Sequence, residues 1–146
     1  MKPKVGIIIG SQSDLPIIEK ATKLLMEMGI DYELTVSSAH RNPKQVAQFA
    51  KTAEKKYDLI IAGAGLAAAL PGVVAAHTYL PVIGIPIASK ALMGHDALFS
   101  IVQMPPGVPV ACVAIDGAKN AAILAAEILS LKYPKLKVKL KKFKGR

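Results

Sequence analysis

The chain has 146 residues, enough for one domain with a sizeable buried core. Hydrophobic residues make up 52% of it and the mean hydropathy is +0.38, an excess that fits surface buried between subunits. The net charge is +9, but eleven Lys and Arg against ten acidic residues leave only +1 before residue 132, so +8 belongs to residues 132–146. A single cysteine excludes a disulfide within the chain and a cysteine metal site.

The first predicted strand is the apolar run Lys4–Ile9, and helical periodicity predicts a helix over Leu15–Met28. Between them lies Gly10-Ser11-Gln12-Ser13-Asp14, where hydroxyls and backbone N–H groups converge at a helix start. Such a turn can cradle a phosphate or a ribose. Ser11 or Ser13 can equally be an ordinary helix cap, so this turn alone does not distinguish a ligand site from a helix cap.

The second predicted strand, Asp31–Val36, leads into Ser37-Ser38-Ala39-His40-Arg41-Asn42-Pro43, and a helix is expected over Pro43–Lys56. The heptad therefore lies at the carboxyl end of a strand, where open α/β sheets bind ligands. It sets a proton-transfer group, His40, beside a fixed cation, Arg41, which suits acid/base chemistry on an anionic substrate. A lone loop histidine is often only a surface residue, so the functional interpretation of this heptad needs support from the other motifs of the chain.

The third predicted strand, 58–62, leads into Gly63-Ala64-Gly65, where small residues allow close approach of a ligand or make a tight turn. A short helix over 70–77 and a strand over 81–87 follow. The uncharged run 59–89 is long enough for a membrane span, but three prolines interrupt it, so we expect none.

The rest of the chain predicts a helix that ends at Val102, a strand over 108–115 and a helix over 118–131. His77 and His95 have no partner at metal-ligand spacing, so no metal site is expected. We expect a catalytic domain over 1–131 and a solvated, partly frayed basic tail over 132–146. The tail lacks the aromatic interleaving of single-strand binders, so we do not expect nucleic-acid binding.

Strands that alternate with helices at this spacing predict a parallel sheet covered on both faces. The expected fold is α/β, a three-layer α/β/α sandwich with about five parallel strands, flavodoxin-like in type. Several strand ends carry small or polar residues that should meet at one edge of the sheet. They suggest proton transfer on a phosphorylated small molecule and do not name it. The absence of a signal peptide predicts a cytoplasmic protein.

Six motifs run in order along nearly the whole chain: Gly-Ser-Gln-Ser-Asp (10–14), Ser-Ala-His-Arg-Asn-Pro (38–43), Leu-Pro-Gly-Val-Val-Ala (70–75), Leu-Pro-Val-Ile-Gly-Ile-Pro (80–86), Ser-Ile-Val-Gln-Met-Pro (100–105) and Asn-Ala-Ala-Ile-Leu-Ala (120–125). Together they resemble the PurE family, which makes 4-carboxy-5-aminoimidazole ribonucleotide in purine biosynthesis. The resemblance implies a homo-octamer with active sites at subunit contacts.

The resemblance also implies roles for residues of the first two motifs. His40 would be the catalytic proton shuttle, and the ribose and phosphate of an aminoimidazole ribonucleotide would be held by Ser11, Ser13, Asp14, Ser38 and Arg41. Further substrate contacts are expected from Gly63, Ala64, Gly65 and Ala69. CO₂ is the expected second reactant, and no metal or other cofactor is implied.

The family has a mutase form, which moves a carboxylate from the exocyclic amine to ring carbon 4, and a carboxylase form, which uses CO₂ directly. Ala69 stands where the mutase form usually has His, and the loop 116–119 is short; both features favour the carboxylase. Arg41 and Gln103-Met104-Pro105 favour the mutase. We expect the mutase, with the carboxylase as the alternative.

Three alternatives stay open at this point. A flavin-binding electron carrier would share the fold, but the chain has no Trp and 5% aromatic residues for stacking a flavin; a colourless protein would exclude it. A nucleic-acid binder acting through the basic tail would lose binding when 132–146 is removed. An inactive paralogue would fit Ala69 and would lack activity on either ribonucleotide.

Overall fold

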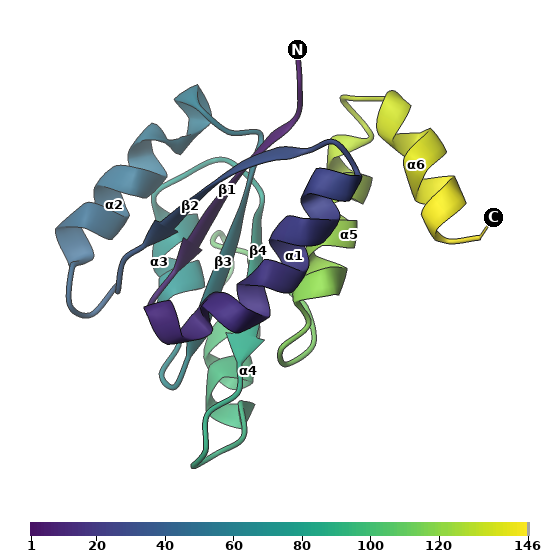
Figure 1. Ribbon diagram of the computed structural model, residues 1–146. Coiled ribbons are helices and arrows are strands. Elements are labelled where there is room, and N and C mark those ends of the chain that lie inside the picture. Colours follow the sequence, from purple (N-terminus) through teal and green to yellow (C-terminus); the bar gives the residue numbers. More distant parts are fainter. Residues whose placement is uncertain (146) are drawn as a thin grey trace.

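A parallel sheet organises the chain, and its strand order is β2-β1-β3-β4-β5 (Figure 1). The computed structural model describes residues 1–145. Each neighbouring pair of strands is parallel. The strands are β1 (Lys4–Ile9), β2 (Asp31–Val36), β3 (Leu59–Gly65), β4 (Val82–Ile87) and β5 (Ala111–Cys112). The predicted α/β/α architecture is confirmed.

Helices cover both faces of the sheet (Figure 1). They are α1 (Leu15–Glu27), α2 (Pro43–Thr52), α3 (Leu70–Ala76), α4 (His95–Val102), α5 (Ala118–Leu129) and α6 (Lys135–Phe143), with 3-10 turns η1 (Gln12–Asp14) and η2 (Ala53–Lys55). Because successive side chains of a strand point to opposite faces, Ile7 and Ile9 pack in the core with α1, α5 and α6. Ile8 packs in the other core, with α2, α3 and α4.

The last strand is much shorter than the predicted 108–115. Only Ala111 and Cys112 pair with β4, opposite Ile83 and Gly84. This strand lies at the sheet edge, where one side has no partner, and Pro109 has no N–H to donate to a ladder. Cys112 is therefore half-buried rather than fully buried.

Two other predicted boundaries are wrong, one in the sheet and one in a helix. The strand expected to end at Ala62 continues through Gly65, so Gly63-Ala64-Gly65 is strand and not turn. The helix expected over 43–56 ends at Thr52 and tightens into η2. Among residues 1–145 no helix is both long and apolar enough to cross a membrane.

The expected frayed tail is also wrong over its described part; Arg146 lies outside the described residues. Residues 135–143 form α6, which lies beside α5 at the end of the chain (Figure 1). Leu136 and Leu140 are buried in the same core as α1 and α5. Composition suggested a solvated tail because lysine dominates it, but the spacing of the two leucines gives the helix one apolar stripe.

Asp58 ties this C-terminal segment to the start of the sheet. Its carboxylate accepts hydrogen bonds from the Lys4 backbone N–H at 3.1 Å, the Lys132 ammonium at 2.7 Å and the Tyr133 hydroxyl at 3.0 Å. Burial raises the pKa of this carboxyl group, but these donors and the Lys132 charge together hold the pKa below its ordinary value. Asp58 therefore stabilises the folded state above that ordinary pKa and loses the effect as the pH falls through the lower value.

Replacing Asp58 by Ala should lower the free energy of unfolding by about 2–3 kcal/mol, because it strips a part-buried hydroxyl and a backbone N–H of their acceptor. Urea unfolding at neutral pH measures the loss. Asp31→Ala is the matched control, since Asp31 pairs with Lys2 in an exposed site; it should cost about 0.5 kcal/mol or less. Equal losses in the two variants would contradict a special role for Asp58.

Candidate active site

A cavity of about 500 Å³ lies at the carboxyl edge of the sheet. Its walls come from the segments that follow four adjacent strands, β2, β1, β3 and β4. Of the predicted site residues, nine line it: Ser11, Ser13, Asp14, Ser38, His40, Arg41, Ala64, Gly65 and Ala69. The topology therefore brings together residues that are up to 58 positions apart in the chain, from 11 to 69.

The turn after β1 presents two hydroxyls and a carboxyl group to the cavity. Ser11 is the N-cap of η1; its Oγ accepts hydrogen bonds from the Ser13 backbone N–H at 3.3 Å and the Ser13 hydroxyl at 2.9 Å. Both serines are exposed, so their remaining hydrogen-bonding capacity faces the open cavity. The helix-cap interpretation and the ligand-cradle interpretation are therefore compatible at Ser11.

Asp14 differs from the serines because only 8% of it is exposed. Burial raises the pKa of its carboxyl group, and a hydrogen bond to the Ser11 backbone offsets part of that rise. A buried carboxylate without a charged partner costs stability unless something binds it. The free protein therefore keeps a buried carboxyl group at the cavity wall.

Asp14→Asn should raise the free energy of unfolding of the ligand-free protein at pH 7. With a raised pKa in the folded state, the native protein holds the Asp14 proton more tightly, and stability falls as the pH rises through that pKa. Asn removes this cost, so the gain should be present at pH 7 and vanish well below pH 3.8.

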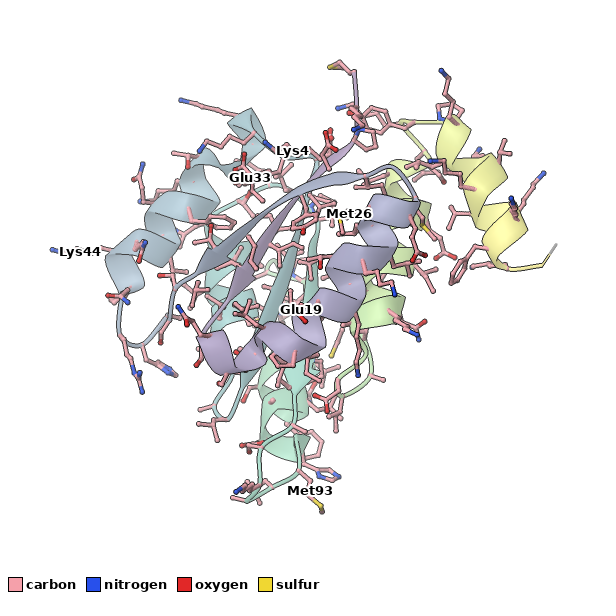
Figure 2. The ribbon with its side chains drawn as sticks, in the orientation of Figure 1. Lys4, Glu19, Met26, Glu33, Lys44 and Met93 are labelled. Atoms are coloured by element: carbon pink, nitrogen blue, oxygen red, sulfur yellow. The ribbon has the colours of Figure 1, made fainter. Side chains whose placement is uncertain are left out.

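Urea unfolding at both pH values measures the Asp14→Asn effect. Glu19→Gln on α1 is the control, because Glu19 is exposed and outside the cavity (Figure 2). A loss of stability at pH 7 in the Asp14 variant would contradict the burial argument.

The turn after β2 carries the histidine and the arginine. The Ser38 carbonyl accepts from the Asn42 backbone N–H at 2.8 Å, and the Ser38 Oγ accepts from the Arg41 backbone N–H at 3.2 Å. These bonds close the turn and leave the exposed side chains of His40 and Arg41 at the cavity wall. The turn thus fixes a proton-transfer group next to a cation, and within residues 1–145 that cation forms no ion pair.

The segment after β3 forms an uncharged wall. Ala64 and Gly65 end the strand, and Ala69 stands at the N-cap position of α3; all three line the cavity. Gly63 does not line it. A Cβ atom on Gly63 would come within 3.2 Å of the Ile18 and Ile87 side chains, so this glycine serves packing in the core.

Nine further lining residues are not among the predicted site residues, and two of them, Ser89 and Leu66, have unusual features. Ser89 follows β4, and its hydroxyl oxygen is buried without a hydrogen-bond partner among residues 1–145. Leu66 follows β3 with a backbone φ of +57°. The position of Ser89 just beyond a predicted strand could have marked it, whereas nothing in the sequence marks the conformation of Leu66.

A metal site is not assembled in the described part of the chain. Within residues 1–145, no group of three or more His, Cys, Asp or Glu side chains could hold a metal ion. His77 and His95, the two histidines besides His40, are exposed and lie outside the cavity wall. The cavity therefore offers one histidine, one arginine, one buried carboxyl group and several hydroxyls.

The family model described as AIR carboxylase matches residues 4–146. The chain belongs to this family. The N5-carboxyaminoimidazole ribonucleotide mutase of Pyrococcus abyssi is 63% identical over 143 residues, which cover 97% of this chain and 82% of that protein. The protein of the same name from Thermotoga maritima is 59% identical over 145 residues, 99% of this chain and 85% of that one.

A solved structure of the AIR carboxylase family agrees with the fold. The crystal structure of Treponema denticola PurE superimposes with a TM-score of 0.90 at 34% identity and covers 99% of this chain and 90% of that chain. A relative named phosphoribosylaminoimidazole carboxylase, from Saccharomyces cerevisiae, is 54% identical over 130 residues, 88% of this chain but 23% of that protein. The predicted family resemblance is confirmed.

Proposed function

We propose that the chain is an enzyme of purine biosynthesis that converts N5-carboxyaminoimidazole ribonucleotide to 4-carboxy-5-aminoimidazole ribonucleotide. One observation carries the proposal: a single cavity holds His40 and Arg41 from one turn and Ser11, Ser13 and Asp14 from another. The names of relatives that are 59–63% identical over nearly the whole chain support the mutase reaction.

The residues suit a reaction in two steps. In the first, the bond between the exocyclic nitrogen and the carboxylate breaks, CO₂ is released inside the cavity, and His40 delivers a proton to the nitrogen. In the second, ring carbon 4 attacks the trapped CO₂, a new carbon–carbon bond forms, and His40 takes up the ring proton. The histidine ends as it began, so the two steps balance in atoms and charge.

Holding CO₂ next to the ring is the physical advantage of one cavity. The second step joins two molecules, and confinement removes the entropy cost of bringing them together again. The uncharged wall formed by Ala64, Gly65 and Ala69 suits an uncharged molecule such as CO₂. The hydroxyls and Arg41 at the other wall suit the ribose and phosphate.

The alternative reaction is direct carboxylation of aminoimidazole ribonucleotide by CO₂. The relative from Saccharomyces cerevisiae supports it by name, and Ala69 leaves no cation on the uncharged wall to hold a carboxylate. Conversion of the N-carboxylated ribonucleotide in labelled bicarbonate distinguishes the two. Transfer without label in the product supports the mutase, and efficient use of aminoimidazole ribonucleotide plus CO₂ alone would overturn it.

Ala69→His should shift the preference further toward the N-carboxylated substrate, because a histidine at this wall would add a donor for the substrate carboxylate. We expect a rise of about tenfold in the ratio of kcat/KM for the N-carboxylated substrate over that for aminoimidazole ribonucleotide plus CO₂, the value of one charge-assisted hydrogen bond. Steady-state rates with both substrates measure it. An unchanged ratio would mean that this position does not control the choice.

We also propose that the enzyme acts in the cytoplasm as a homo-oligomer, an octamer by family resemblance. Large apolar side chains stay exposed at and beside α4, among them Leu92, Phe99 and Val102. We also expect the apolar run 66–78 to contribute to subunit contacts, although part of it is used inside the chain, where Leu70 and Val74 are buried. Contacts through the α4 region would cover apolar surface that a monomer leaves in water. A light-scattering mass near 15.4 kDa would contradict the oligomer.

A further inference from the structure

Leu66 combines two unfavourable features in the cavity wall. Its backbone φ is +57°, a conformation that a bulky L-residue rarely adopts. The residue is 60% exposed, so packing inside the chain does not offset the cost of that conformation. Such outliers persist where the surrounding structure holds them, and they gather at ligand sites.

Among residues 1–145, two other non-glycine residues have positive φ, Met93 at +54° and Asp116 at +57°. Asp116 is accounted for: aspartate tolerates this region, and its Oδ1 accepts a hydrogen bond from the Ala88 backbone N–H at 2.9 Å. Met93 is 67% exposed at a loop tip (Figure 2) and does not line the cavity. Leu66 is the only one of the three that belongs to the cavity wall among residues 1–145.

The strand order gives the cavity a direction. The segments after β2 and β1 carry His40, Arg41 and the serine and aspartate side chains. The segment after β3 begins with Leu66 and continues with three alanines, 67–69, and the segment after β4 carries Ser89. Neighbouring strands are about 4.8 Å apart, so the alanine segment lies roughly 5–10 Å from the turns after β1 and β2. A nucleotide with its phosphate at Arg41 would extend its heterocycle toward the alanine segment, along the turn that carries His40.

We propose that Leu66 covers the heterocycle of the bound ribonucleotide and determines affinity for that end of the ligand. The inference rests on the proposed function, because it takes the ligand to be an aminoimidazole ribonucleotide. The exposed side chain would lose its water-facing surface against the ring face, which is the stabilisation absent from the free protein. Leu66 would then act on the heterocycle and leave the ribose and phosphate contacts alone.

Calorimetric titration tests this with two ligands, aminoimidazole ribonucleotide and ribose 5-phosphate, which lacks the heterocycle. Leu66→Gly should bind the ribonucleotide about five- to tenfold more weakly and ribose 5-phosphate as the wild type does. Leu66→Ala, which keeps a Cβ at positive φ, should show the same selective loss. Met93→Gly is the matched control, since it relieves the same backbone conformation outside the cavity; its affinities should be unchanged.

Thermal melting and light scattering are followed in all variants. Leu66→Gly and Met93→Gly should melt at or slightly above the wild-type temperature, because glycine adopts positive φ without strain. Unchanged ribonucleotide affinity in Leu66→Gly, or an equal loss for both ligands, would overturn the proposal. A fall in molecular mass with affinity retained would assign Leu66 to a contact between copies and would also overturn it. A wild type that binds neither ligand would overturn the proposed function as well.

Discussion

His40→Asn should lower kcat by about 10²–10⁴-fold, the range over which general acid–base groups act. His40 is exposed at the cavity wall, on a turn closed by the Ser38 hydrogen bonds. Both proposed steps move a proton to or from the substrate, and asparagine cannot carry that proton at neutral pH. Because neither of the Ser38 hydrogen bonds uses the His40 side chain, the substitution should leave the fold intact.

The measurement is single-turnover conversion of the N-carboxylated ribonucleotide, with affinity determined separately. Ribonucleotide affinity should change by less than about threefold, since His40 moves protons rather than anchoring the ligand. His77→Asn serves as the control, because His77 is exposed at the end of α3 and away from the cavity wall. Near wild-type turnover in the His40 variant would remove this residue from the mechanism.

Arg41→Ala should weaken ribonucleotide binding by about 10- to 100-fold, the value of a charge-assisted hydrogen bond to phosphate. Arg41 lines the cavity, and its guanidinium has no carboxylate partner among residues 1–145. Its charge is therefore available to the ligand. The variant should also show a shallower fall of affinity with salt, because one phosphate contact is gone.

Lys44→Ala gives the matched control for Arg41. Lys44 is an exposed cation three residues along the chain, and its side chain points away from the molecule on α2 (Figure 2). We expect less than a twofold change there, and partial recovery in Arg41→Lys, which keeps the charge but not the planar fork. Equal losses in the Arg41 and Lys44 variants would show a general field effect instead of a phosphate contact.

The sheet and the cavity at its carboxyl edge could be predicted because they depend on local patterns. Strands β1 and β2 have the predicted bounds, and the turns that follow them carry the predicted Ser11 and His40 to the cavity wall. Parallel strands bring their carboxyl ends to one edge, so the sequence order of the turns was enough to predict that they meet.

The predictions that were wrong depend on contacts between residues that are far apart in the sequence. Gly63 was predicted to contact the substrate for the same reason as Gly65, its lack of a side chain, but the Ile18 and Ile87 side chains pack over it. The charge of 132–146 suggested a frayed tail, whereas Leu136 and Leu140 dock α6 into a core made by α1 and α5. Leu66 has its unusual backbone conformation in the connection between β3 and α3, and the sequence pattern does not predict it.

The helix α6 concentrates positive charge at one end of the molecule. Its lysines stand exposed on an ordered helix at the end of the molecule away from the carboxyl edge of the sheet (Figure 1), while residues 1–131 carry a net charge of only +1. Two copies that approach through their α6 ends repel one another within a Debye length of about 8 Å. Encounters through the exposed apolar side chains Leu92, Phe99 and Val102, at and beside α4, meet no such barrier. The charge of this helix would therefore disfavour any association of copies through their α6 ends.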